Sequence, residues 1–151
     1  MKKIYVLNGP NLNLLGKREP HVYGQASLQD LIQGLEKCAK ELGIVISSYQ
    51  SNHEGDIIDR LHEANEKKYE GVILNPGAFT HYSYAIRDAI AGIDIPVVEI
   101  HLSNVHARES FRRESVTAPV SIGQISGFGF YGYHMALHAL LERIKGEQIH
   151  E

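Results

Sequence analysis

The sequence predicts an α/β fold in which a parallel β-sheet carries helices on both faces. Short apolar runs alternate with amphipathic segments from one end of the chain to the other, which is typical of this class. The chain has 151 residues, a length that suits one domain, and it contains no internal repeat, low-complexity tract or linker. We therefore expect residues 1–151 to form a single domain.

The pattern opens with an apolar run at residues 4–7, which ends at turn-forming residues and predicts a buried strand. A helix is expected at residues 28–42, where leucine and other apolar residues recur at helical spacing. Ser27 can cap the first turn of this helix, and Gly43 can end it. Residues 44–49 carry β-branched side chains and predict the second strand.

The remaining elements continue this alternation. In chain order they are a helix, a strand, a helix, a strand, a weaker strand and a last helix, at residues 56–69, 71–75, 84–93, 96–101, 120–125 and 131–145. Five strands in a chain of this length fit a flavodoxin-like three-layer sandwich with a five-stranded parallel sheet. Binding sites of such folds open at the carboxyl ends of the strands.

The composition argues against several other classes of protein. Hydrophobic residues make up 43% of the chain and charged residues 22%, which is ordinary for a globular protein, and the net charge of −3 does not suit a general nucleic-acid binder. No apolar run approaches the ~20 residues of a membrane span, and the apolar run at the N-terminus is too short for a signal peptide. We expect a cytoplasmic protein whose single cysteine, Cys38, is a buried structural thiol.

Polar side chains follow three of the predicted strands at the point where each strand ends. Asn11 comes after the first strand, Asn75 and His81 end or follow the third, and the fourth contains Glu99 and His101. Because parallel strands bring their carboxyl ends to one edge of the sheet, these side chains should lie close together. Asparagines beside glycine and proline are also common turn formers, so this alternative stays open for each of them.

Glu99 and His101 lie two positions apart on one predicted strand, so their side chains point to the same face of the sheet. A carboxylate next to an imidazole fixes the tautomer of the ring and favours its protonated, proton-donating form. The two residues could therefore provide a general acid. The alternative is a structural ion pair at the end of the strand.

Arg18 and Tyr23 share a loop that is bounded by Gly16 and Gly24. The pKa of a free tyrosine is roughly 10, and a guanidinium nearby lowers it, which makes the phenol a better base at neutral pH. A loop of this kind can also close over a substrate and exclude water. Taken alone, this pairing of residue types is a weak signal.

A locally basic segment, residues 108–113, follows the fourth strand and contains Arg112. Such a segment is often only a solvated surface. Its place in the chain nevertheless brings an arginine within reach of the same edge of the sheet. A small anionic or polyhydroxylated substrate would suit it better than a phosphodiester.

Two further motif matches do not support the chemistry that they suggest. Residues 127–132 fit G-x-G-x-x-G, but no strand follows the next helix, so we expect a tight turn or close helix packing there. His134 and His138 have the spacing of a helical zinc pair, but Met135 stands where the zinc signature has glutamate. We expect neither a metal nor a cofactor.

Three blocks of the sequence resemble the type II 3-dehydroquinate dehydratases. They are LNGPNLNLLGKREP at residues 7–20 with Tyr23 and Gly24, NPGAFTH at residues 75–81 with AIRDA at residues 85–89, and EIHLSN at residues 99–104 with RESFR at residues 108–112. The resemblance runs from the first strand to Tyr133 without a large insertion. Long signatures of this kind are far more specific than a six-residue pattern.

The resemblance implies a cofactor-independent hydro-lyase that removes water from the small anion 3-dehydroquinate and yields 3-dehydroshikimate. This step of the shikimate pathway proceeds in the family by trans elimination through an enolate. By the same resemblance, Tyr23 would be the general base, ionised with help from Arg18, and His101 would be the general acid. Glu99 would orient His101, and Asn11 would help to hold a water that stabilises the enolate.

The resemblance also implies substrate contacts and an assembly. The residues that would bind substrate hydroxyls or the carboxylate are Asn75, His81, Arg112, Leu102 and Ser103. Asp88 would act across a subunit interface, because members of the family assemble trimers into a homo-dodecamer.

Two alternatives from other functional classes stay open at this point. One is a nicotinamide-dependent oxidoreductase that uses the glycine pattern at residues 127–132. The other is a flavodoxin-like binding module without catalysis. A bound flavin or nucleotide would give the purified protein a characteristic absorbance, whereas the dehydratase requires neither.

Overall fold

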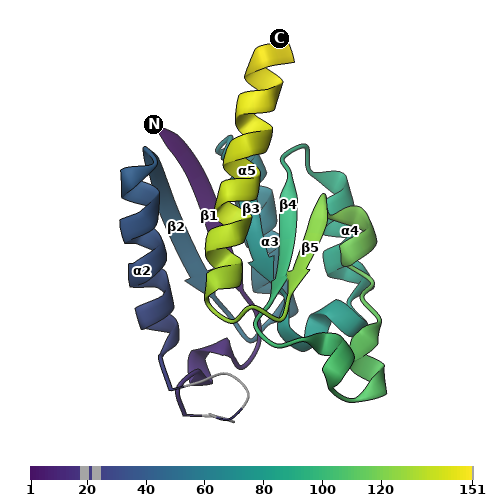
Figure 1. Cartoon of the computed structure of the whole chain (residues 1–151). Coiled ribbons are helices and arrows are strands. Elements are labelled where there is room, and N and C mark those ends of the chain that lie inside the picture. The colour runs from purple at the N-terminus through teal and green to yellow at the C-terminus, as the bar shows by residue number, and fades with distance from the viewer. Residues whose placement is uncertain (18–20, 22–24, 151) are drawn as a thin grey trace.

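The computed structural model describes residues 1–17, 21 and 25–150. Within them, five parallel strands form one sheet in the order β2-β1-β3-β4-β5. These are β1 (Lys2–Asn8), β2 (Ile44–Gln50), β3 (Gly71–Asn75), β4 (Val97–His101) and β5 (Gly123–Ser126). The strands in Figure 1 all point toward one edge of the sheet, so that their carboxyl ends meet there.

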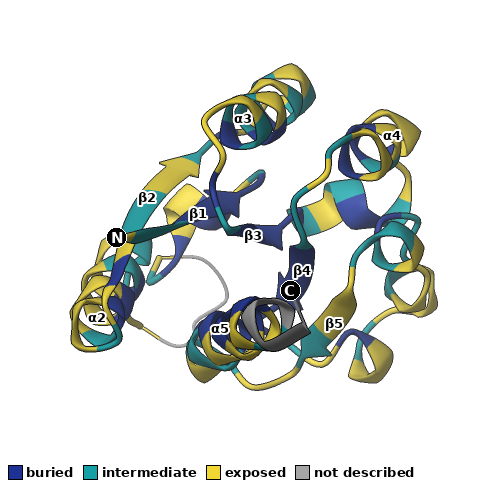
Figure 2. Cartoon of the chain, turned by 90° about the horizontal axis from the view of Figure 1, so that it is seen from above, coloured by how far each residue is buried: buried dark blue, intermediate teal, exposed yellow. Residues whose placement is uncertain are grey.

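Helices cover both faces of this sheet, which confirms the three-layer α/β sandwich expected from the sequence. On one face lie α2 (Leu28–Glu41) and α5 (Tyr131–His150), and on the other lie α3 (Glu54–Glu66) and α4 (Tyr84–Gly92) (Figures 1 and 2). Since successive side chains of a strand point to opposite faces, β1 supplies both cores. Its Ile4 and Val6 pack under α2 and α5, and its Tyr5 and Leu7 pack under α3 and α4.

The predicted caps of the first helix are present. The Ser27 hydroxyl accepts a hydrogen bond from the backbone N–H of Asp30 at 3.1 Å, and the Asp30 carboxylate accepts one from the N–H of Ser27 at 3.0 Å. This capping box satisfies two N–H groups that the first turn of a helix leaves without partners. At the other end Gly43 takes a left-handed φ of 74° and redirects the chain into β2.

The predicted boundaries of three elements are wrong by a few residues. The last helix, expected to end at residue 145, runs to His150. The fifth strand, expected at residues 120–125, begins only at Gly123, because the preceding segment Ala118–Val120 forms a 3-10 helix, η5, that contains Pro119. The second helix, expected at residues 56–69, begins at Glu54 and ends at Glu66. Lys68 has a φ of 56° just beyond its end, a left-handed conformation that an α-helix cannot continue through.

Short 3-10 helices, which the sequence pattern did not predict, follow the carboxyl ends of three strands. They are η1 (Leu12–Leu14) after β1, η2 (Gly77–His81) after β3, and η3 (Val105–Ala107) and η4 (Ser110–Arg113) after β4. The first two loops approach each other so closely that a Cβ on Gly9 would lie 2.5 Å from the carbonyl oxygen of Pro76. Only glycine permits this approach, which brings the loops after β1 and β3 to one place.

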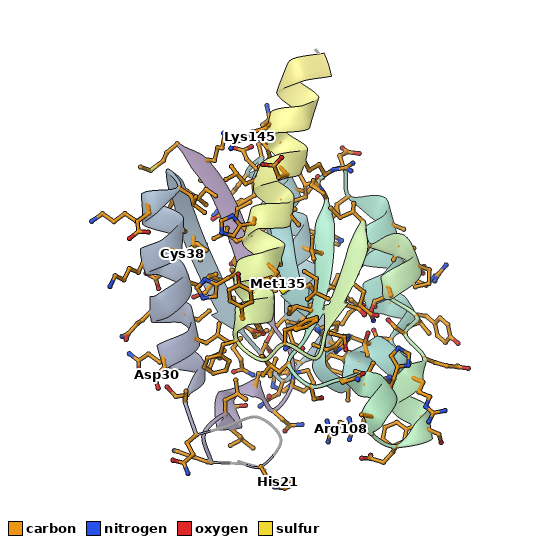
Figure 3. The ribbon with its side chains drawn as sticks, in the orientation of Figure 1. His21, Asp30, Cys38, Arg108, Met135 and Lys145 are labelled. Atoms are coloured by element: carbon orange, nitrogen blue, oxygen red, sulfur yellow. The ribbon has the colours of Figure 1, made fainter. Side chains whose placement is uncertain are left out.

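The structure also tests the expectations for Cys38 and for membrane-spanning helices. Cys38 on α2 is half-buried and packs against the core under α2 and α5, less deeply than expected (Figure 3). Among the helices of the described residues, none combines the length and the apolar character needed to cross a membrane.

Candidate active site

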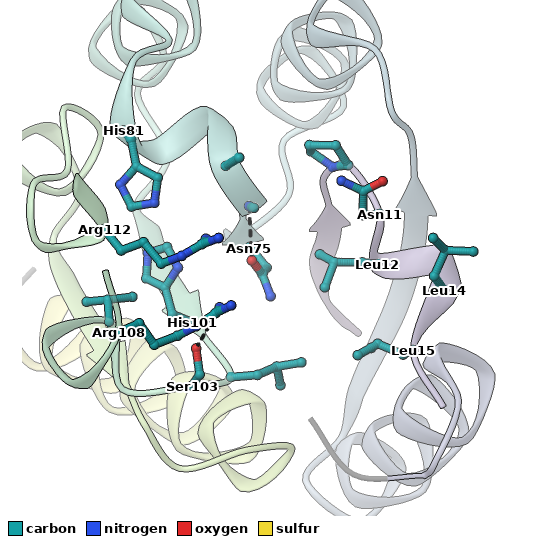
Figure 4. A pocket seen from close by; sticks show the side chains of 15 residues that line it. Asn11, Leu12, Leu14, Leu15, Asn75, His81, His101, Ser103, Arg108 and Arg112 are labelled. Atoms are coloured by element: carbon teal, nitrogen blue, oxygen red, sulfur yellow. Dashed lines mark hydrogen bonds between the residues drawn. The ribbon is translucent and has the colours of Figure 1, made fainter. Parts of the chain in front are cut away.

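A pocket opens at the carboxyl edge of the sheet, where the loops after β1, β3 and β4 meet. Figure 4 shows two unlike walls. One is cationic and comes from η2, the end of β4, the end of η3 and η4, with His81, His101, Arg108 and Arg112. The other is mainly apolar and comes from the loop after β1, with Leu12, Leu14 and Leu15 beside Asn11. A small molecule with one anionic side suits such a pocket.

His101 lies in the pocket, and Glu99 lies behind it, away from the lining. The two residues are 7% and 0% exposed, and His101 Nε2 lies 2.9 Å from Glu99 Oε2. Burial by itself raises the pKa of Glu99, but hydrogen bonds from His101, Thr117 and Gln124 outweigh it and hold the pKa below its ordinary value. Because the ionised carboxylate can only accept, Nε2 donates to it. Nδ1 is then the ring nitrogen that can exchange a proton with a molecule in the pocket.

A second buried cluster fixes the amide of Asn75 at the floor of the pocket. Asn75 Oδ1 accepts from the N–H of Gly77 at 3.1 Å, and Asn75 Nδ2 donates to the hydroxyl of Tyr133 at 2.9 Å. That hydroxyl donates in turn to Asn8 Oδ1 at 2.5 Å. Burial raises the pKa of Tyr133, so its hydroxyl stays protonated. The direction of each hydrogen bond is therefore determined, and one N–H of Asn75 is left for a ligand.

The cationic wall is held in place by its own contacts. Arg112 Nε donates to Glu109 Oε2 at 3.0 Å, and this hydrogen bond lowers the pKa of Glu109. His81 Nδ1 donates to the carbonyl of Glu114 at 2.7 Å, which leaves its Nε2 available to a ligand. Both residues thus have one end fixed by the protein and the other available to the pocket.

Arg108 is a lining residue that the sequence argument did not single out. It extends from the basic segment to the carboxyl edge of the sheet, and its Nη1 lies 3.5 Å from the hydroxyl of Ser103 (Figures 3 and 4). The segment at residues 108–113 was noted for its charge, but only Arg112 was chosen from it. Charge alone cannot tell which arginine of such a segment turns toward the pocket.

The apolar wall was also missed. Leu12, Leu14 and Leu15 belong to a stretch that reads as a polar loop, because asparagines alternate with the leucines. Asn11 has a left-handed φ of 70°, and its N–H donates to Asn52 Oδ1 at 2.9 Å, which holds the start of η1. The leucine spacing in this stretch is the signal that could have indicated an apolar surface.

The predicted site residues fall into three groups. Those that line the pocket are Asn11, Asn75, His81, His101, Leu102, Ser103 and Arg112. Glu99 contacts the pocket only through His101, and Asp88 is exposed on α4, outside the lining of the pocket in its own subunit. Arg18 and Tyr23 lie outside the described residues, but Leu15, three positions before Arg18, lines the pocket.

The glycine pattern at residues 127–132 forms a tight turn and a close helix contact, as the sequence analysis expected. Gly127 and Gly129 have φ values of 98° and 58°, and their N–H groups donate to the carbonyls of His101 and Leu102 at 3.2 and 2.9 Å. These N–H groups are therefore not free to bind a pyrophosphate. A Cβ on Gly132 would lie 2.6 Å from Cδ1 of Ile100, so glycine allows α5 to pack closely on β4.

Metal ligands do not gather in the part of the chain that the structure describes. Within residues 1–17, 21 and 25–150, no group of three histidine, cysteine, aspartate or glutamate side chains is placed to hold a metal ion. The ring of His134 stacks on that of Tyr131, with 6.0 Å between the centroids.

The fold and the pocket together define a class of protein: an α/β sandwich with an acid–base site for a small anion at the carboxyl edge of its sheet. The comparisons with known proteins narrow this class. The family described as Dehydroquinase class II matches residues 2–141. The chain belongs to this family, and the resemblance noted in the sequence is confirmed.

Individual relatives agree with this assignment. The chain is 63% identical over 145 residues to the 3-dehydroquinate dehydratases of Bacillus mycoides and Bacillus cereus, covering 96% of this chain and 99% of each relative. The type II dehydroquinase structure from Butyrivibrio crossotus matches with a TM-score of 0.91 and 51% identity, over 92% of this chain and 97% of that one. The structure from Propionibacterium acnes matches with a TM-score of 0.90 and 41% identity, over 93% and 96%.

Neither alternative class finds support in these matches. An oxidoreductase would need a nucleotide at the glycine turn, where the N–H groups already have partners. A binding module without catalysis does not account for a buried carboxylate paired with a pocket imidazole. The family and the geometry instead agree on a lyase.

Proposed function

We propose that this protein dehydrates 3-dehydroquinate to 3-dehydroshikimate by acid–base chemistry that requires no cofactor. The observation that supports this most directly is the pairing of His101 with the buried Glu99 at a cationic pocket. The reaction is the one that names the family, and the pairing gives His101 the ability to protonate a leaving hydroxyl. The reaction belongs to the shikimate pathway, which leads to aromatic amino acids.

The first step is removal of a proton from the carbon next to the ketone of the substrate. We assign it to the phenolate of Tyr23, with Arg18 lowering the pKa of the phenol. The electron pair of the broken C–H bond moves to the ketone oxygen and forms an enolate. Asn11, on the wall opposite His101, would help to hold a water that donates a hydrogen bond to that oxygen.

The second step is expulsion of the hydroxyl group. The enolate collapses back to the ketone, the new carbon–carbon double bond forms, and the C–O bond breaks. His101 gives a proton to the departing oxygen, which leaves as water. Positioned acids and bases contribute typically ~10²–10⁴-fold, so fixed donors near the enolate must supply much of the remaining acceleration.

Different residues of the pocket would bind the hydroxyls and the carboxylate of the substrate. Asn75, His81 and Arg112 would bind the substrate hydroxyls through the amide, imidazole and guanidinium ends that their fixed contacts leave available. Leu102 and Ser103 would bind the carboxylate. Arg108 lies next to Ser103, so we add it as the cation that neutralises this carboxylate.

The first test is a cofactor-free assay that follows the growth of enone absorbance when 3-dehydroquinate is added. We expect turnover by the wild type and its loss in Tyr23→Phe, with substrate binding largely retained in a calorimetric titration. Tyr49→Phe, on the exposed end of β2, is the matched control and should keep full activity. Turnover that persists in Tyr23→Phe would remove the assigned base.

We also propose a homo-oligomer, a dodecamer built from trimers, in which Asp88 completes the site of a neighbouring subunit. Asp88 is exposed on α4, and the large aromatic side chains of Tyr82 and Tyr84 are 58% and 68% exposed nearby on the chain. Apolar surface of this kind is often covered by another subunit. Light scattering tests the size of the assembly.

Subunit mixing tests the role of Asp88. Asp88→Asn alone should lower kcat/KM roughly tenfold or more, the usual range for one lost hydrogen bond to a charged group. Co-expressed with His101→Ala, it should recover activity, because mixed assemblies contain sites with both residues intact. Tyr23→Phe mixed with His101→Ala should recover none, since both residues belong to one subunit's site. Recovery in that control, or none with Asp88→Asn, would contradict the assignment.

The cytoplasmic location expected from the sequence is likewise proposed. The proposed substrate of the protein is a charged metabolite of a biosynthetic pathway. This suits an enzyme that shares a compartment with the other enzymes of that pathway. Cell fractionation of the native host, followed by the enone assay on each fraction, tests it.

A further inference from the structure

Glu99 is a carboxylate with no exposed surface, which is an unfavourable position for a charge. Its recorded ion-pair partner among the described residues is His101, which is charged only when protonated. The other cationic or titratable groups near this end of β4, namely His81, Arg108 and Arg112, line the pocket in front of His101. The charge of Glu99 therefore depends on neutral donors whenever His101 has given up its proton.

Three neutral side chains supply these donors. Gln124 Nε2 donates to Glu99 Oε2 at 2.6 Å, the Ser115 hydroxyl lies 3.0 and 3.2 Å from the two carboxylate oxygens, and the Thr117 hydroxyl makes a short hydrogen bond to Oε1. We call Ser115, Thr117 and Gln124 the carboxylate cradle. None of them lines the pocket, so none can contact a substrate there.

The cradle is attached to the rest of the site from two directions. The hydroxyl of Thr80, at the end of η2, lies 2.8 Å from the hydroxyls of both Ser115 and Thr117. The N–H of Val116 donates to the carbonyl of Thr80 at 2.7 Å. Gln124 stands opposite Glu99 on the neighbouring strand β5. The donors thus come from one loop and one strand, whose places are fixed by main-chain hydrogen bonds.

We propose that Ser115, Thr117 and Gln124 are positioning residues that keep Glu99 an acceptor, so that His101 holds its acidic proton on the nitrogen facing the pocket. This inference rests on the proposed function, because it concerns the acid of that reaction. With the cradle intact, Glu99 accepts from Nε2, and a proton taken up by the ring resides on Nδ1. Without the cradle, the buried carboxyl takes up a proton and donates to Nε2 instead. The ring is then neutral, and its Nδ1–H is a far weaker acid.

Two substitutions test the cradle. Thr117→Val keeps the shape of the side chain but removes the hydroxyl, and Gln124→Leu removes the amide at a position that tolerates change because it lies on the edge strand β5. For each we expect kcat to fall roughly tenfold and the alkaline limb of the pH–rate profile to move about one unit to higher pH, because the pair of Glu99 and His101 then holds its shared proton more tightly. KM should change less than kcat, because the cradle does not contact the pocket.

Matched controls separate positioning from folding. Thr117→Ser keeps the hydroxyl and should restore both kcat and the pH profile. Ser121→Ala removes a hydroxyl that donates to the carbonyl of Thr117 and not to Glu99, and it should leave the profile unchanged. If Thr117→Val unfolds, Gln124→Leu remains informative, since an edge-strand change leaves the core intact.

A readout that does not depend on turnover distinguishes this inference from the proposed function. Nitrogen NMR of labelled histidine rings, with His101→Ala to assign the signal, reports which ring nitrogen carries a proton at neutral pH. We expect Nε2 to be protonated in the wild type and to become an acceptor in Thr117→Val and Gln124→Leu. An unchanged ring and an unchanged pH profile would overturn the cradle, whereas absence of turnover in the wild type would overturn only the proposed reaction.

Discussion

Two buried polar clusters lie beneath the same pocket, and they differ in one respect that decides their roles. The first joins Glu99 to His101 and contains a charge. The second joins Asn8, Tyr133 and Asn75 and is neutral throughout. Both present one group to the pocket. The charged cluster can move a proton, and the neutral cluster can only hold an amide still.

The free-energy cost of burying the two clusters differs because only one of them contains a charge. Burying a carboxylate is expensive unless several donors satisfy it, and here four side chains do so. The neutral cluster needs only one partner for each of its atoms, and a single tyrosine provides two of them. Most of the buried side-chain hydrogen bonds at the site are therefore made to the Glu99 carboxylate, the one buried group that carries a charge.

The largest expected effect comes from breaking the charged cluster at its pocket end. His101→Ala should lower kcat by about 10²–10⁴-fold, the usual contribution of a positioned acid. Circular dichroism should show normal folding. His62→Ala, on the exposed face of α3, is the control and should keep wild-type activity. A kcat within a few-fold of the wild type would show that another group protonates the leaving hydroxyl.

An intermediate effect is expected from the neutral cluster, and it should appear in stability. Tyr133→Phe leaves Asn8 Oδ1 and Asn75 Nδ2 buried without a partner, which should lower the free energy of unfolding by about 1–3 kcal/mol. KM should rise because the Asn75 amide is less fixed, while the pH profile stays unchanged. Urea unfolding measures the first effect. Tyr131→Phe, at an exposed position of α5, should be neutral in both measurements.

The smallest expected effect is on the pH dependence of stability, to which only the charged cluster contributes. The pKa of Glu99 is lower in the folded protein than in the unfolded chain, where it is about 4.3. The stability from this carboxylate is therefore fully present above that value, and it is lost as the pH falls toward the folded pKa. Urea unfolding between pH 3 and pH 7 should show a flatter acid limb in Glu99→Gln than in the wild type. Glu109→Gln, at an exposed carboxylate, should leave the limb nearly unchanged.

The fold and the pairing of Glu99 with His101 could be predicted from the sequence, because both depend on local periodicity. The strand ending in His101 is buried at every position, as both faces of a central parallel strand are covered, and its apolar residues predicted it. Its two-residue spacing placed Glu99 and His101 on one face without any knowledge of tertiary contacts. The capped first helix was equally local.

The parts that sequence reasoning missed depend on tertiary contacts. Thr117 and Gln124 reach Glu99 from positions 18 and 25 residues away along the chain, and no spacing rule connects them. Tyr133 reads as one apolar position of an amphipathic helix, and only the fold shows that its hydroxyl meets Asn75. The start of β5 was misplaced because Val120, a β-branched residue that suits a strand, belongs to the 3-10 helix η5.

The position of Gln124 on the outermost strand has a consequence for how the enzyme matures. Among the described residues, the side chains that line the pocket come from residue 112 or earlier, so these residues are all synthesised before β5. The amide that secures the buried charge arrives only when this last strand joins the border of the sheet. A chain that stops short of residue 124 would lack this amide, and it would also lack α5, whose Tyr133 fixes Asn75 in the pocket. The site is therefore complete only when the last strand and the last helix have been synthesised and have joined the sheet.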